Sequence, residues 1–169
     1  MIIIIKKIIV TTFVIYLLGL VNFVIVKFFG NFHVVEKRIE EVLQQRERYG
    51  IWNISIEPFR SISASVHSFI RDPSLGVVTQ FFIGNILIFI PLGFLLPLLY
   101  KRYSFTKVML TSLGIIVSIE LIQFATCLGI ADIDDVILNM FGSGLGYLIF
   151  ILTEKLFAIR KNYLGSHSF

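Results

Sequence analysis

The sequence predicts an all-α integral membrane protein, a bundle of about four transmembrane helices with an amphipathic helix in the outer loop. Of its 169 residues, 56% are hydrophobic and only 15% are charged, whereas soluble domains are roughly 45–50% apolar and about 25% charged. The mean hydropathy is +0.87. The apolar residues form long uninterrupted runs, and a hydrocarbon core of about 30 Å needs roughly 20 such residues per helix.

Charge and cysteine content exclude several other classes of protein. The formal net charge is +4, but the basic residues gather at the ends of apolar runs, as membrane topology predicts, and form no basic segment for nucleic acid. The single cysteine, Cys127, excludes an intrachain disulfide. No Cys/His spacing indicates a zinc site.

The first element is the apolar run Ile8–Val26, which we interpret as an uncleaved anchor within an N-terminal segment, residues 1–29. Lys6 and Lys7 precede the run and Lys27 follows it. A secretory signal peptide would have a shorter apolar core and a cleavage site of small residues.

Residues 30–80 form a polar loop whose first part, Val34–Arg48, is predicted to be an amphipathic helix. Six acidic and six basic residues cancel within this loop, so its charge does not favour anionic lipid. We therefore expect an interfacial helix, or one packed on a partner. Its predicted contact face consists of Val35, Ile39, Val42 and Arg46.

Three further spans form the predicted core, residues 81–158, followed by a tail, residues 159–169. The second span contains two prolines, each of which removes a backbone hydrogen bond and predicts a kink or a break. The fourth span contains a GxxxG spacing, which lets helix backbones approach closely and could also pair two copies of the chain. The spans are Phe81–Tyr100 with Pro91 and Pro97, Val108–Phe124, and Val136–Phe157 with Gly142 and Gly146.

The distribution of charge predicts the orientation in the membrane. Lys101, Arg102 and Lys107 join spans two and three without an acidic residue, and a basic cluster follows span four. The loop between spans three and four is acidic and has no basic residue. Because lysine and arginine accumulate on the cytoplasmic side, both termini are expected inside and residues 30–80 outside.

Glu120 and Gln123, near the end of span three, are the first candidate site residues. Their spacing of three places both side chains on one helix face. A carboxylate within an apolar helix costs about 2.5–3.5 kcal/mol at the membrane centre and is often functional. The structural alternative is a protonated Glu120 that bonds to a neighbouring helix.

The second candidate is the acidic segment Asp132, Asp134 and Asp135, followed by Asn139. If a helix begins near Asp132, then Asp132, Asp135 and Asn139 lie on one face. Acidic residues at a helix N-terminus can also act only as caps. Their oxygen atoms could alternatively hold a divalent cation, although the spacing is not that of an EF-hand. No cofactor is otherwise evident.

Asn85 in span two and the segment Glu57-Pro58-Phe59-Arg60 complete the candidate set. Asn85 could form an interhelical hydrogen bond, and Arg60 offers a forked cation to an anionic group. Under the expected topology the polar ends of antiparallel spans lie at one level, which indicates a polar pocket at the outer face. The expected pocket residues are Glu57, Arg60, Asn85, Glu120, Gln123, Asp132, Asp135 and Asn139.

These residues also resemble a known family. The segment from Gly84-Asn85 to Pro91-Leu-Gly93 is similar to the N-x-x-x-F-x-P-x-G signature of VanZ-like proteins. The stretch from Glu120 through Asn139, with Gly142 and Gly146 after it, resembles the second block of that family. Glu57-Pro58-Phe59 resembles its N-x-x-P-F element, with Asn53 or Ser55 at the polar position.

Three departures from the family pattern affect its interpretation. Many relatives have an arginine just before the acidic motif, where this chain has Cys127-Leu-Gly-Ile-Ala131, so an anion-binding role would be absent or pass to Arg60. Some relatives have a fifth span. Met140-Phe141 replaces a small Thr-rich step after the asparagine, which predicts different local packing.

The resemblance implies a bacterial cell-membrane protein of a family named for low-level resistance to the glycopeptide teicoplanin. Glu120, Asp132 and Asp135 would form the polar centre, and Pro91 and Gly93 would shape one wall. The expected partners are the bilayer and a lipid-linked cell-wall precursor or lipoglycopeptide. The alternatives are a membrane-embedded hydrolase or transferase that acts on a lipid phosphate, and a small transporter or structural partner of envelope enzymes.

Overall fold

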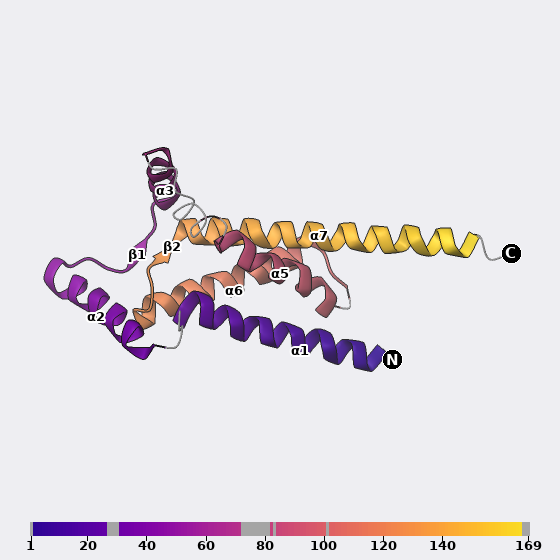
Figure 1. Ribbon diagram of the computed structural model, residues 1–169, viewed down its shortest axis with the longest axis horizontal. Coiled ribbons are helices and arrows are strands. Elements are labelled where there is room, and N and C mark those ends of the chain that lie inside the picture. Colours follow the sequence, from indigo (N-terminus) through magenta and orange to yellow (C-terminus); the bar gives the residue numbers. More distant parts are fainter. Residues whose placement is uncertain (1, 27–30, 72–81, 83, 101, 167–169) are drawn as a thin grey trace.

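The computed structural model confirms an all-α, membrane-type fold (Figure 1). It describes residues 2–26, 31–71, 82, 84–100 and 102–166. Two strands of two residues each form a small parallel pair among the helices. The elements are α1 (Ile2–Leu20), η1 (Val21–Val26, a π-helix), α2 (Phe32–Tyr49), β1 (Ile54–Ser55), α3 (Arg60–Arg71), α5 (Gly84–Leu99), α6 (Phe105–Thr126), β2 (Ala131–Asp132) and α7 (Ile133–Ser166).

Three helical segments of the described chain are long and apolar enough to cross a membrane: Ile3–Val26, Phe105–Thr126 and Ile133–Phe157. They correspond to the first, third and fourth expected spans. The second expected span corresponds to α5, whose 16 residues are about 24 Å long, and its expected start at Phe81 lies outside the described residues. The helix α7 continues to Ser166, so the expected boundary between residues 158 and 159 does not coincide with a helix end.

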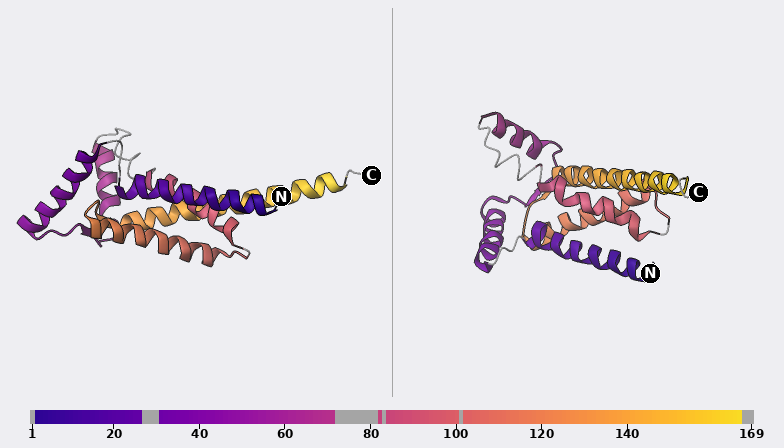
Figure 2. Two further views of the ribbon diagram at one scale, coloured as in Figure 1. Left: turned by 90° about the horizontal axis from the view of Figure 1, so that it is seen from below. Right: turned by 45° about the vertical axis from the view of Figure 1, so that its right-hand side comes forward.

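The apolar helices lie alongside one another, and both chain termini lie at the same end of the bundle (Figure 1). The helices α2 and α3 and the strand pair lie at the opposite end, an arrangement that both views of Figure 2 preserve. This polar end is where α1 and α6 finish and where α5 and α7 begin. The antiparallel arrangement therefore brings the candidate residues of different helices to one level.

The helices α5 and α7 pack backbone to backbone through glycine. A Cβ atom at Gly142 would overlap the carbonyl oxygen of Ile86, and one at Gly146 would overlap that of Ile90. From α5, a Cβ atom at Gly93 would overlap the carbonyl oxygen of Ser143. The expectation that the GxxxG face packs on another span is confirmed. The face is occupied within one chain, so it is not the free surface that we expected for pairing two copies.

The core of the bundle surrounds the middle of α5, which continues through both of its prolines. Pro91 has no N–H to donate to the carbonyl four residues earlier, and the next carbonyl, that of Ile88, accepts a 2.9 Å hydrogen bond from the Tyr16 hydroxyl of α1. The kink or break expected at the prolines is therefore not a break. The buried cluster comprises Leu20, Ile25, Phe89, Leu92, Leu96, Val108, Ile116 and Ile119.

The polar loop contains two helices, of which the sequence predicted one. The first, α2, begins after Asn31, whose side chain accepts from the His33 N–H, and ends at Gly50 in the left-handed conformation (φ 63°). The predicted contact face of α2 is half-buried, as expected for a helix packed on one side. The second, α3, and the strand pair were not predicted, because a Ser-rich segment and two-residue strands have weak local signals.

Candidate functional site

The connection between α6 and α7 is held in place by Asn53. Its backbone carbonyl accepts from the Ala131 N–H at 3.0 Å, next to the parallel pairing of Ile54 with Ala131. Its side-chain amide donates to the carbonyls of Gly129 (2.7 Å) and Phe124 (3.3 Å). The final carbonyls of a helix have no partner within the helix, so Asn53 caps the C-terminal end of α6 from a distant part of the chain.

Arg46 of α2 supports the same helix end. Its guanidinium donates to the Asn53 side-chain oxygen and to the Phe124 carbonyl at 3.2 Å. It also lies over the rings of Trp52 and Phe124, with its Cζ atom 4.9 and 5.3 Å from their centroids. A cation at a helix C-terminus is favourable because the helix dipole is negative there. Arg46 thus fastens α2 to the end of α6.

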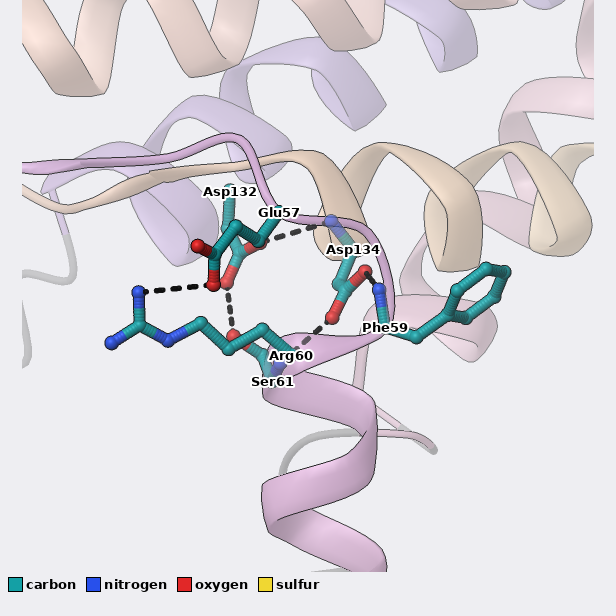
Figure 3. Close-up of polar contacts among 6 residues, drawn as sticks. All are labelled: Glu57, Phe59, Arg60, Ser61, Asp132 and Asp134. Atoms are coloured by element: carbon teal, nitrogen blue, oxygen red, sulfur yellow. Dashed lines mark hydrogen bonds and ion pairs between the residues drawn. The ribbon is translucent and has the colours of Figure 1, made fainter.

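Asp134 connects α7 to the outer loop (Figure 3). It is fully buried, and its carboxylate accepts from the backbone N–H groups of Phe59 (2.6 Å), Ser61 (2.8 Å) and Ile62 (3.0 Å). Two of these N–H groups belong to the first turn of α3, where helical N–H groups have no intrahelical acceptor. Asp134 is therefore a structural anchor that starts α3 beside α7, whereas we expected it to line the pocket.

Asp132 and Glu120 form a second polar link between helices. One Asp132 oxygen accepts from the Asp134 N–H at 2.9 Å and caps α7. The other accepts from the Ser61 hydroxyl (Figure 3). Glu120, only 5% exposed, accepts from the Asp132 N–H at 3.0 Å. Both the structural interpretation of Glu120, a bond to a neighbouring segment, and the capping interpretation of Asp132 are thus realised.

Asp135 joins the site to α5. Its carboxylate accepts a 2.7 Å hydrogen bond from the Asn85 amide, which is the interhelical bond expected of Asn85. Asn139 lies one turn further along α7 and is 1% exposed, and within the described chain its Oδ1 atom has no hydrogen-bond partner. The structure therefore brings Asn85, Glu120, Asp132 and Asp135 together at the polar end, with Asn139 buried beneath them.

A polar cleft of about 370 Å³ opens between α2 and the connection from α6 to α7. Both faces of the cleft carry ionisable or amide groups, so it can accept a hydrogen-bonding ligand. The lining residues are Arg38, Glu41, Val42, Gln45, Gln123, Leu128, Gly129, Ile130, Asp132 and Asp135.

An apolar groove of about 290 Å³ lies beside the polar cleft. Asp132 lines both spaces, so the carboxylate marks a boundary between a polar and an apolar surface. Glu120 also lines the groove, whose other walls are the β1 strand and the apolar faces of α6 and α7. These walls include Ile54, Ile56, Val117, Leu121, Phe124, Ile133 and Val136.

Two of the expected pocket residues, Glu57 and Arg60, lie away from the cleft. Both side chains are mostly exposed, and they pair with each other at 3.5 Å (Figure 3). Pro58 and Phe59 form the turn between them, and Phe59 has a left-handed backbone (φ 67°). Arg60 therefore does not replace the arginine that the chain lacks before the acidic motif. The cation that lines the cleft is Arg38 of α2, which the sequence analysis missed.

The acidic residues do not form the divalent-cation site that the sequence allowed. Among the described residues, no group of three or more His, Cys, Asp or Glu side chains could hold a metal ion. Asp132 and Asp134 accept from backbone N–H groups instead, because they lie at the N-termini of two helices.

The site defines a class of protein: a helical membrane protein whose polar centre lies at one end of its bundle, where two loop helices meet the transmembrane helices. A family model described as VanZ/LLP1 matches residues 13–154. The chain belongs to the VanZ/LLP1 family, as its motifs indicated.

One curated relative is similar to part of the chain. Protein VanZ of Enterococcus faecium is 38% identical over 73 residues, which are 43% of this chain and 45% of that protein. The chain thus matches slightly less than half the length of this relative. No solved structure matches, so the arrangement of the site is taken from this structure alone.

Proposed function

We propose that this VanZ-like protein protects the bacterial cell envelope against glycopeptides such as teicoplanin through a polar cleft that faces outward. The observation that supports the proposal is the joining of four family-motif residues, Asn85, Glu120, Asp132 and Asp135, at the edge of one cleft. Those residues are hydrogen-bonded to one another or to adjacent backbone, so substitutions there alter the site directly.

The charge of the two ends favours an outward orientation of the cleft. Arg102 and Lys107 lie at the opposite end of the bundle, in or next to the connection from α5 to α6. The connection from α6 to α7 carries aspartate without lysine or arginine. Basic connections remain cytoplasmic, which places the polar end outside, where lipid-linked cell-wall precursors and glycopeptides meet.

The alternative of a hydrolase or transferase on a lipid phosphate has less support. A metal-assisted reaction would need a cluster of ligands, and the described residues do not provide one. Chelator-sensitive release of phosphate or head group by the purified protein would favour this alternative over a binding role.

Teicoplanin susceptibility of a host strain tests the proposal. Cells that express the wild-type chain are expected to survive higher teicoplanin concentrations than empty-vector cells. Glu120→Ala and Asp135→Ala should return susceptibility to the empty-vector level, because each removes a carboxylate from the site.

Glu40→Gln provides the control. Glu40 lies on α2, is exposed and does not line the cleft, so this variant should protect as well as the wild type at a matched membrane level. Equal susceptibility of wild-type, variant and empty-vector cells would remove glycopeptide protection as the function of this chain.

A further inference from the structure

The polar cleft contains an excess of negative charge. Its ionisable lining consists of one arginine, Arg38, and three carboxylates, Glu41, Asp132 and Asp135. The arginine is engaged in the fold, since its guanidinium donates to the Val26 carbonyl at the end of η1 (3.2 Å). Outside the lining, Lys37 lies 3.9 Å from Glu41, and both side chains are more than half exposed. Such a solvated pair neutralises little charge.

Gln123 supplies an independent indication of what the cleft binds. The side chain is 3% exposed and lines the cleft. Its Nε2 atom donates to the Val24 carbonyl at 3.0 Å, which fixes the orientation of the amide, because the reverse orientation would place two oxygens together. Within the described chain its Oε1 atom has no hydrogen-bond partner. A buried acceptor without a partner is costly, so a hydrogen-bond donor is required there.

Carboxylates and an unused amide oxygen are all acceptors, and their preferred ligand is a cation that donates several hydrogen bonds. A primary ammonium group has three N–H donors and a positive charge. A phosphate or carboxylate, in contrast, would meet like charge. The adjacent groove, which shares Asp132 with the cleft, offers an apolar surface to a hydrocarbon chain attached to the ammonium group.

We propose that the cleft binds the ammonium group of a membrane amphiphile, with its hydrocarbon part in the groove beside Asp132. The proposal rests on the proposed function, because it takes the cleft as the working site and assigns the chemical class of its ligand. It differs from the expectation of an anion site at Arg60.

Titration of the purified full chain in phosphatidylcholine nanodiscs tests this proposal. The probes are dodecylammonium, dodecyl phosphate and dodecanol, with empty nanodiscs giving the contribution of simple partitioning. Dodecylammonium is expected to bind saturably, and the other two probes are expected to match empty nanodiscs. Asp135→Asn should weaken dodecylammonium binding about tenfold, since it removes a charge-assisted hydrogen bond.

Two neighbouring residues of α2 provide a matched pair that leaves the fold intact. Glu41 lines the cleft and Glu40 does not, and both are exposed. Glu41→Gln should weaken binding by about two- to fivefold, as expected for a solvated charge, whereas Glu40→Gln should leave binding unchanged.

Several outcomes would overturn the proposal. These are binding of dodecyl phosphate or dodecanol as tight as that of dodecylammonium, identical titrations with and without protein, and equal affinities of the Glu41 and Glu40 variants. If propylammonium binds as tightly as dodecylammonium, the ligand is a water-soluble amine and the membrane source is wrong. Loss of teicoplanin protection in the cleft variants without any ammonium binding would overturn this inference and leave the proposed function standing.

Discussion

Gly146→Ala is expected to destabilise the bundle severely, although it adds a single methyl group. The new Cβ atom would overlap the Ile90 carbonyl oxygen of α5, and neither helix backbone can move aside without disturbing the rest of their contact. Overpacking of a close-packed interior typically costs about 1–3 kcal/mol and occasionally more. The contact here is with backbone, so we expect a cost at or above the upper limit of that range.

Gly144→Ala provides the control for this prediction. Gly144 lies in the same helix two residues earlier, and a Cβ atom there would meet nothing within 4 Å. Alanine also has a higher helix propensity than glycine by about 1 kcal/mol. The thermal midpoint of unfolding in detergent should therefore fall strongly for Gly146→Ala and stay the same or rise for Gly144→Ala. Equal midpoints would contradict the close approach of α5 and α7.

Asp134→Asn is expected to release the turn at residues 57–62 from α7. The aspartate uses both oxygens to accept three backbone N–H groups, whereas an asparagine has one acceptor oxygen and would direct its own N–H groups at the remaining donors. Phe59 in addition has a left-handed backbone, a conformation that surrounding contacts must hold in place.

Amide hydrogen exchange followed by mass spectrometry measures this release. A loss of about 2 kcal/mol of local stability corresponds to roughly thirtyfold faster exchange at residues 59–62. Glu57→Gln, which breaks only the exposed pair with Arg60, should leave exchange nearly unchanged. Unaltered protection in Asp134→Asn would show that Asp134 does not anchor α3.

The sequence predicted those parts of the fold that depend on local periodicity. Long apolar runs determine α1, α6 and α7, and the small residues Gly142 and Gly146 predicted close helix packing. The face of α2 was also predictable, because its residues recur at helical spacing. In each case neighbouring residues in the chain carry the whole signal.

The parts that the sequence did not predict depend on contacts between distant segments. Asn53 caps α6 from a position about 70 residues away, and the acceptor bonds of Asp134 reach back to residues 59–62. The sequence could not distinguish Asp134, a buried anchor, from Asp132 and Asp135, which line the cleft. The position of Asn53 in the family motif was the one signal that indicated a role for it.

The central claim is that the cleft faces the outside of the cell. Labelling of intact cells with a membrane-impermeant maleimide tests it most directly, using Glu40→Cys near the cleft and Arg102→Cys in the connection from α5 to α6. Both positions are exposed, whereas Cys127 is buried and the wild type measures its background. We predict labelling of Glu40→Cys in intact cells and of Arg102→Cys only after permeabilisation. The reverse pattern would place the cleft in the cytoplasm and contradict the account.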